Sequence, residues 1–183
     1  LPPQEDSTLH KPFTDKELEL LWKLAPEHKN VQVVLILCYT GMRPTELCKI
    51  KRANVNLAEH YMLGGIKTPA GKNRVIPIAN KIHSFVKALY DEGHTMLLED
   101  EDGPLTYDKL RPRYWKTAMT LMPLTMRDHL PPDGRHTCAT MMDNIGINEK
   151  IKKLILGHAS KEITERTYTH KTIEQLVEAI NQI

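Results

Sequence analysis

The chain has 183 residues, with 25 lysines and arginines against 23 aspartates and glutamates, and a formal net charge of +2. This length suits one domain or two closely packed ones, and it buries enough surface to fold without disulfide bonds. A mildly basic charge permits a nucleic-acid partner without requiring one. No apolar run reaches the roughly 20 residues that span a bilayer, and no signal peptide is visible, so we expect a cytoplasmic protein.

The first part of the chain is predicted to be helical. Thr14 and Glu17 form a capping-box pattern ahead of a set of apolar residues, which predicts the start of a helix. Residues 30–40 are apolar on nearly all sides and indicate a buried central helix. Gly41 can end this helix as a left-handed cap, and Pro44 suits the first position of the next helix.

A small β element follows these helices. Residues 61–66 and 74–78 are strand-like, and the segment between them is rich in turn-forming residues, which predicts a hairpin. A third strand is expected near residues 55–57. The predicted fold class is therefore mainly α with a small antiparallel hairpin or three-stranded sheet.

Helical spacing returns in the second half of the chain. An acidic surface loop is expected over residues 91–104. Helices are predicted after residue 77 and at residues 107–121, 134–145, 148–156 and 161–169. Residues 171–183 are predicted as a C-terminal tail helix, and its apolar stripe suits packing either on its own domain or on a neighbouring protomer.

The cysteines and histidines argue against a metal protein. Cys38, Cys48 and Cys138 have no CxxC spacing and lie among apolar residues, so we expect free buried thiols in a reducing compartment. The nine histidines are scattered and form no HExxH pattern, which disfavours a zinc protein.

Four segments hold side chains that suit a phosphate and a nucleophile. They read TGMRPTEL (40–47), GGIKTPAGKNRVIPI (64–78), DGRHTCAT (133–140) and LGHASKEITERTYTH (156–170). Taken singly, each has an ordinary interpretation, such as an Arg43–Glu46 surface ion pair, a solvated lysine or a packed tyrosine. Taken together, the cations stabilise the charge on a phosphate while a phenol attacks it, which suggests DNA cleavage through a covalent tyrosine intermediate without a metal.

In this order, the four motifs resemble those of the tyrosine recombinases, the phage integrase family, and the resemblance covers nearly the whole chain as the catalytic domain of that family. The integrases of conjugative transposons look most similar. The resemblance implies that Arg43 and Arg135 bind the scissile phosphate and that His158 contacts it. It also implies that Lys67 protonates the leaving 5′ oxygen and that Tyr168 is the nucleophile.

The resemblance further implies a site-specific recombinase or integrase that cuts and rejoins double-stranded DNA through a 3′-phosphotyrosyl bond, with no cofactor. A homotetramer on DNA and an excisionase-type accessory protein are the implied partners. Residues 1–183 would be a fragment, because the DNA-binding domains of such proteins precede the catalytic domain. Contacts with the DNA backbone are expected from Lys51, Arg52, Lys72 and Arg74.

One position departs from the family pattern. The family usually has histidine or lysine three residues before the second arginine, where this chain has Pro132. The departure predicts weakened activity, compensation by His129 or His158, or an altered copy. Two other functions stay open, a non-catalytic helical DNA-binding regulator and a type IB topoisomerase-like enzyme, which uses a similar site.

Overall fold

The computed structural model describes residues 10–65, 73–158 and 168–183. The α-helices in this part of the chain are α1 (Asp15–Leu24), α2 (Lys29–Thr40), α3 (Pro44–Leu47), α4 (Asn80–Asp91), α5 (Tyr107–Leu110), α6 (Thr117–Thr120), α7 (Asp133–Asn144), α8 (Glu149–Leu156) and α9 (His170–Ile180). The strands are β1 (Val55–Asn56), β2 (Tyr61–Gly64), β3 (Arg74–Pro77), β4 (Glu99–Asp100) and β5 (Gly103–Pro104). The shorter helical turns are η1 (Ala25–Glu27), η2 (Arg52–Asn54), η3 (Arg111–Lys116) and η4 (Leu124–Met126).

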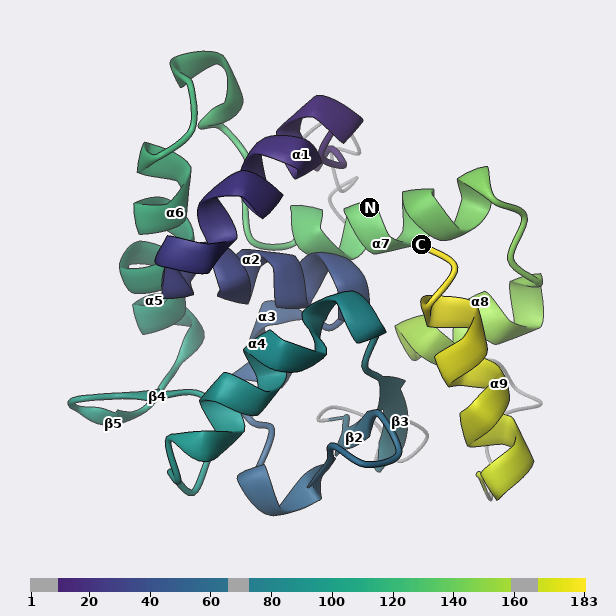
Figure 1. Cartoon of the computed structure of the whole chain (residues 1–183). Helices are drawn as coiled ribbons and strands as arrows, with labels where there is room; N and C mark the ends of the chain where they lie inside the picture. Colours follow the sequence, from purple (N-terminus) through teal and green to yellow (C-terminus); the bar gives the residue numbers. More distant parts are fainter. Residues whose placement is uncertain (1–9, 66–72, 159–167) are drawn as a thin grey trace, which may run out of the picture.

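Helix α2 lies at the centre of the molecule and contacts α1, α4, α7, η3 and α6 (Figure 1). Nearly all its side chains from Val31 to Thr40 are buried, as the apolar pattern of residues 30–40 predicted. The helix ends at Gly41, whose φ of 66° is a left-handed conformation that favours glycine. Pro44 then begins α3, four residues after the end of α2.

Helix α1 packs on α2 and begins at the predicted capping box. The Thr14 N–H donates to the Glu17 carboxylate over 2.7 Å, and the Glu17 N–H donates to the Thr14 hydroxyl over 3.3 Å. These two bonds satisfy backbone donors that the first turn of a helix leaves free. The helix ends at Leu24, and Pro26 follows in the turn η1.

The three-stranded sheet has the antiparallel order β1–β2–β3, which confirms the predicted hairpin and third strand. In the β2–β3 register Tyr61 faces Pro77 and Gly64 faces Arg74, the last pair before the hairpin tip. Both strands are shorter than the sequence predicted. The tip itself, residues 66–72, lies outside the described residues.

The predicted helix at 107–121 is present as α5, η3 and α6, which follow one another without a break. Its middle segment, η3, is a π-helical turn that contains Pro112. Proline has no N–H for the regular helical bond, so a wider turn at this point is physically consistent. Trp115 in η3 is buried, and its indole N–H donates to the His129 carbonyl over 2.8 Å.

The tail helix α9 packs on α8 and β3 of its own chain. Leu176 and Ile180 are fully buried there, and the Asn80 N–H donates to the Asn181 side chain over 2.7 Å. Of the two packing arrangements that the sequence allowed, this structure therefore has the one on the tail's own domain. Of the predicted helix at 161–169, residues 161–167 lie outside the described part, and residues 168 and 169 are not helical.

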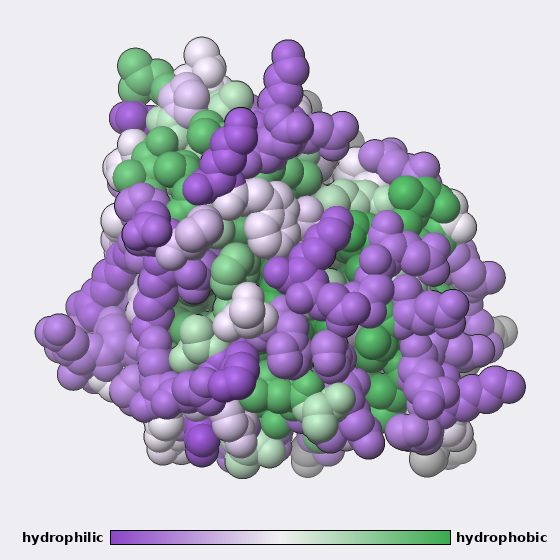
Figure 2. All heavy atoms as spheres, in the orientation of Figure 1, coloured by the Kyte–Doolittle hydropathy of each residue, from purple (hydrophilic) through white to green (hydrophobic). Residues whose placement is uncertain are grey.

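The predicted surface loop at 91–104 is partly wrong, because β4 and β5 pair within it as a short hairpin. All three cysteines are free and buried, as expected. On the face shown in Figure 2, hydrophilic side chains predominate and separate the hydrophobic ones into patches. None of the helices within the described ranges is long and apolar enough to cross a bilayer.

Candidate active site

Arg43 stands at the junction between α2 and α3. It precedes the first residue of α3, its side chain is exposed, and it forms no ion pair with a described residue. Its backbone N–H donates over 3.3 Å to the carboxylate of Glu46, three residues along the chain. The ordinary interpretation of Arg43 as the ion-pair partner of Glu46 is wrong, because that carboxylate binds a different arginine.

Arg135 lies in the first turn of α7 and reaches back to the α2–α3 junction. Its Nη1 donates over 2.8 Å to the carbonyl of Gly41, two residues before Arg43. Its Nη2 is buried and has no hydrogen-bond partner among the described residues. Burial and then the nearby charges of Arg43 and Arg74 lower the pKa of Arg135 to about 10, which keeps it charged at neutral pH. A buried cationic donor without a partner favours an anionic ligand.

His158 stands in the turn that follows α8. Gly157 has a φ of 66° and ends the helix, and the His158 N–H donates to the Lys153 carbonyl over 3.1 Å. His158 is exposed, but its neighbours still desolvate the imidazole and lower its pKa, and the charges of Arg135 and Arg43 lower it further. The side chain of Leu156, two residues before His158, packs against Gly41, whose carbonyl accepts a hydrogen bond from Arg135, so the end of α8 lies beside the α2–α3 junction and the start of α7. The lowered pKa favours the neutral imidazole before an anion binds.

Arg74 corrects a prediction, because it does not lie on the surface where it could bind a DNA phosphate. Its side chain is 3% exposed. Nε and Nη2 donate to the two carboxylate oxygens of Glu46 over 2.9 and 2.7 Å, and Nη1 donates to the Ile155 carbonyl over 2.5 Å. The prediction failed because Arg74 is the first residue of β3, a strand in which every residue is buried.

His129 does not replace the missing basic residue at Pro132. Its Nδ1 lies 2.9 Å from the carboxylate of Asp133 and its Nε2 lies 3.2 Å from that of Glu17. The ring is buried and packs on Phe13, with 3.9 Å between ring centroids. Burial opposes protonation of His129, but the hydrogen bonds to the two carboxylates outweigh it and raise the pKa above its ordinary value. Nδ1 is hydrogen-bonded to Asp133 and Nε2 faces the Glu17 carboxylate inside the fold, so the buried ring cannot reach a phosphate and His158 is left as the predicted compensating residue.

Tyr168 is half-buried and packs against the core immediately before Thr169, the N-cap of α9. No hydrogen bond within the described residues joins its hydroxyl to Arg43, Arg135 or His158. Its role as a nucleophile therefore stays a prediction. Lys67 and Lys72 lie outside the described residues.

The other two predicted DNA-binding residues lie around η2. Lys51 is exposed. Arg52 has its Nε–H bound to the Tyr90 carbonyl over 2.8 Å, and its guanidinium lies 4.1 Å from the centre of the Tyr90 ring. Arg52 thus holds η2 against the end of α4. Contact between its remaining N–H groups and DNA stays a prediction.

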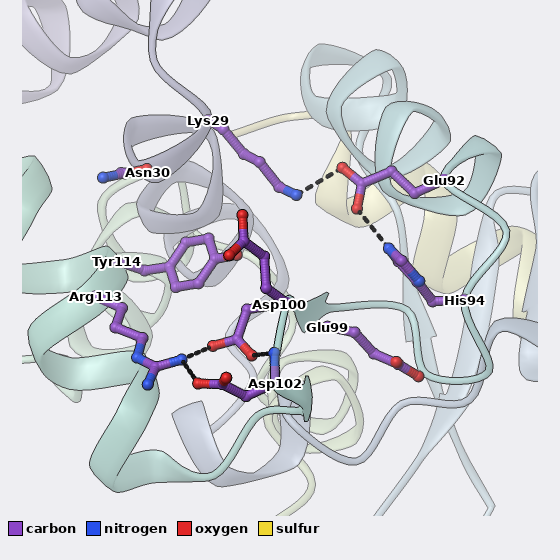
Figure 3. A pocket seen from close by; sticks show the side chains of 10 residues that line it. Lys29, Asn30, Glu92, His94, Glu99, Asp100, Asp102, Arg113 and Tyr114 are labelled. Carbon is purple, nitrogen blue, oxygen red and sulfur yellow. Dashed lines mark hydrogen bonds and ion pairs between the residues drawn. The ribbon is translucent and has the colours of Figure 1, made fainter.

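A second region, the acidic hollow, lies at the opposite end of the molecule from α8 and α9 (Figure 1). It has a volume of about 700 Å³ and lies between α2, the end of α4, the β4–β5 hairpin and η3. Its cations are bound by its own acids: Lys29 by Glu92, and Arg113 by Asp100 and Asp102 (Figure 3). Its lining is Lys29, Asn30, Glu92, His94, Glu99, Asp100, Glu101, Asp102, Arg113 and Tyr114. Five acids against two strong bases repel a phosphate, so this hollow is a poor site for DNA.

Comparison with known proteins places these features in a family. The model described as "Phage integrase family" matches residues 11–175. Tyrosine recombinase XerA of Pyrococcus furiosus is 30% identical over 189 residues, which cover 98% of this chain and 64% of the relative. The chain therefore spans less than two thirds of the length of that curated relative.

Solved structures agree with the fold. The Tn1549 transposon integrase in complex with transposon right end DNA matches with a TM-score of 0.69 and 18% identity, over 96% of this chain and 67% of that one. The lambda integrase tetramer bound to a Holliday junction matches with a TM-score of 0.62 and 16% identity, over 86% of this chain and 49% of that one. With a family model that matches most of its length, the chain belongs to the phage integrase family.

Proposed function

We propose that this chain is the catalytic domain of a site-specific DNA recombinase that cuts and rejoins duplex DNA through a 3′-phosphotyrosyl bond. The observation that carries the proposal is that three separate segments meet at Gly41: Arg135 of α7 binds its carbonyl two residues before Arg43, and Leu156 of the turn that leads to His158 packs against it. In particular, the buried Nη2 of Arg135, which has no partner within residues 10–65, 73–158 and 168–183, is a donor for a phosphate oxygen.

In the proposed reaction, Arg43 and Arg135 bind the non-bridging oxygens of the scissile phosphate and stabilise the charge of the transition state. The Tyr168 hydroxyl oxygen attacks phosphorus as the bond to the 5′ oxygen breaks. Lys67 gives a proton to the departing 5′ oxygen, His158 donates a hydrogen bond to a non-bridging oxygen, and the phenolic proton passes to water. A 5′ hydroxyl of the partner strand reverses the step. The phosphoester link is kept in the intermediate, so no nucleotide hydrolysis is required.

The proposal includes assembly on DNA, because strand exchange joins two duplexes. Two protomers would bind each crossover site, giving a homotetramer, and an excisionase-type protein would set the direction. The lambda integrase structure contains a tetramer on a Holliday junction, which supports this arrangement for a protein of the same family. Residues 1–183 would then act together with DNA-binding domains.

Membership of the family favours an enzyme over a non-catalytic DNA-binding regulator, because the regulator would not need the Leu-Gly-His turn beside two arginines. A type IB topoisomerase-like enzyme would use the same chemistry but would relax supercoils as a monomer. Relaxation of a plasmid that carries one site, measured beside recombination between two sites, separates these functions.

The decisive experiment is covalent capture on a library of nicked duplexes with a randomised central segment. The short strand released at the nick diffuses away, so the protein–DNA adduct accumulates. We expect an adduct with the wild-type chain, none with Tyr168→Phe, and an undiminished yield with Tyr107→Phe, which alters another half-buried tyrosine. The absence of an adduct with the wild-type chain, or its persistence in Tyr168→Phe, would refute the proposal.

A further inference from the structure

The ion pair between Arg74 and Glu46 is enclosed on all the sides that the structure describes. The two side chains are 3% and 4% exposed. Gly64 lies against the carboxylate, because a Cβ built on it would come within 3.3 Å of Glu46 Oε1. Gly157 lies against the guanidinium, because a Cβ there would come within 2.6 Å of Arg74 Nε. The close approach of two glycine backbones leaves no room for water, so the pair sits in a medium where an unpaired charge is very costly.

The partners of Arg74 belong to the two turns that carry active-site side chains. Glu46 lies three residues after Arg43, and its carboxylate also accepts the Arg43 backbone N–H. Ile155 lies three residues before His158 on the last turn of α8. A single guanidinium with three bonds therefore fixes the backbone under Arg43 and the backbone under His158 relative to each other.

Arg74 also ties both turns to the sheet. It is the first residue of β3 and pairs in register with Gly64 at the described end of the hairpin. A planar guanidinium holds several acceptors in a fixed geometry, whereas a lysine ammonium is a point charge without a fixed fork. The charge of Glu46 offsets that of Arg74, so the pair adds structure to the site without adding net charge.

We propose that Arg74 and Glu46 are positioning residues that hold the Arg43 turn and the His158 turn at the distance at which both side chains reach one phosphate. Their effect on cleavage rests on the proposed function, while their effect on the position of the His158 turn does not. A displacement of about 1 Å at a reacting centre costs on the order of 100-fold in rate, so loosening this pair should slow cleavage strongly.

The first test measures geometry without any reaction. NMR titration of the His158 imidazole reports the surroundings of its turn, since desolvation and then the charges of Arg135 and Arg43 lower its pKa. We expect Arg74→Lys to raise the pKa of His158 toward its ordinary value, because the turn moves away from the two arginines. Arg113→Lys is the matched control, since Arg113 also binds two carboxylates but lies in the acidic hollow. An unchanged His158 titration in folded Arg74→Lys overturns the inference whether or not the chain cuts DNA.

The second test measures chemistry on a duplex isolated by covalent capture. At saturating DNA we expect Arg74→Lys and Glu46→Gln each to slow adduct formation by about 10- to 100-fold. The double variant should be no slower than the worse single one, because the two residues act as one unit. DNA affinity should change by less than about threefold, because neither side chain is exposed to the phosphate backbone.

A neutral substrate separates positioning from general destabilisation. A methylphosphonate at the scissile position removes the negative charge that Arg43 and Arg135 must stabilise, so misplacing them matters less. We expect the Arg74→Lys defect to shrink to a few-fold on this substrate. If the Arg74→Lys defect is equal on both substrates, a positioning role is contradicted. A normal rate on the phosphodiester, at a temperature where the variant is fully folded, contradicts it as well. A wild-type chain that forms no adduct refutes the proposed function but leaves the titration result in force.

Discussion

The candidate active site and the acidic hollow both contain arginines, and they differ in what those arginines bind. In the hollow, Arg113 is 44% exposed and binds Asp100 and Asp102 within a single short hairpin. In the site, Arg135 has a buried Nη2 that no described residue binds, and Arg74 is bound by the distant segments that hold Glu46 and Ile155. An arginine that is neutralised by neighbouring acids at the surface contributes little to stability or binding. An arginine that has no acidic partner and lies beside other cations favours the binding of an anion.

The largest effect expected from this comparison is on catalysis. Arg135→Ala removes the unpaired donor and a full charge from the phosphate, so adduct formation should fall by about 100- to 1,000-fold. Single-turnover capture assays at saturating DNA measure this rate. Arg113→Ala serves as the matched variant and should react at the wild-type rate. Equal losses in both variants would mean that the two arginines do not differ in function.

The second effect is on stability. Glu46→Gln leaves Arg74 buried with an uncompensated charge, which should lower the free energy of unfolding by about 3–5 kcal/mol. Urea unfolding followed by circular dichroism measures the loss. Asp102→Asn alters an exposed partner of Arg113 and should unfold at nearly the wild-type urea concentration. If Glu46→Gln is as stable as Asp102→Asn, burial does not distinguish these two ion pairs.

The third effect is a dependence of DNA binding on pH. In the free chain, desolvation and the charges of Arg135 and Arg43 lower the pKa of His158. A bound phosphate stabilises the protonated imidazole and raises this pKa. At a pH between the pKa of the free chain and the pKa of the complex, DNA binding is therefore accompanied by uptake of a proton. Affinity should therefore increase a few-fold as the pH falls through that range. His158→Gln should lose this increase in a fluorescence anisotropy titration. A wild-type affinity that is flat with pH would place the imidazole away from the phosphate.

The smallest effect concerns the hollow itself. Its carboxylates lie at the opposite end of the molecule from α8, and salt screens interactions between exposed charges that are far apart. Asp102→Ala should therefore change DNA affinity by less than about twofold at physiological salt. The same anisotropy assay measures this change, and a large gain in affinity would indicate that DNA also passes over the hollow.

Local patterns predicted several elements well. The capping box at Thr14, the left-handed Gly41 and the apolar segment 30–40 each specify their conformation through neighbours in sequence, and all three are confirmed. The hairpin was predicted in place, although its strands are shorter. The β4–β5 hairpin was missed, because strands of two residues carry no alternating pattern to recognise.

Side-chain roles were predicted less well where burial decides them. Arg74 was expected to contact DNA because a charged residue after a turn is usually exposed, and Glu46 was expected to bind Arg43 because it is three residues away. Both expectations fail because the β2–β3 hairpin and the end of α8 close over the pair. His129 was a candidate to compensate for Pro132, yet two carboxylates on α1 and α7 occupy it.

The sequence by itself determined the helices, the hairpin and which residue types were present for phosphate chemistry, because capping, periodicity and turn preferences act between near neighbours. Only the tertiary structure decided which cations are neutralised and which remain free. That outcome depends on contacts between residues far apart in the chain, such as Arg74 with Glu46 and Ile155. It also depends on burial, since the same ion pair is worth far more away from water than at the surface.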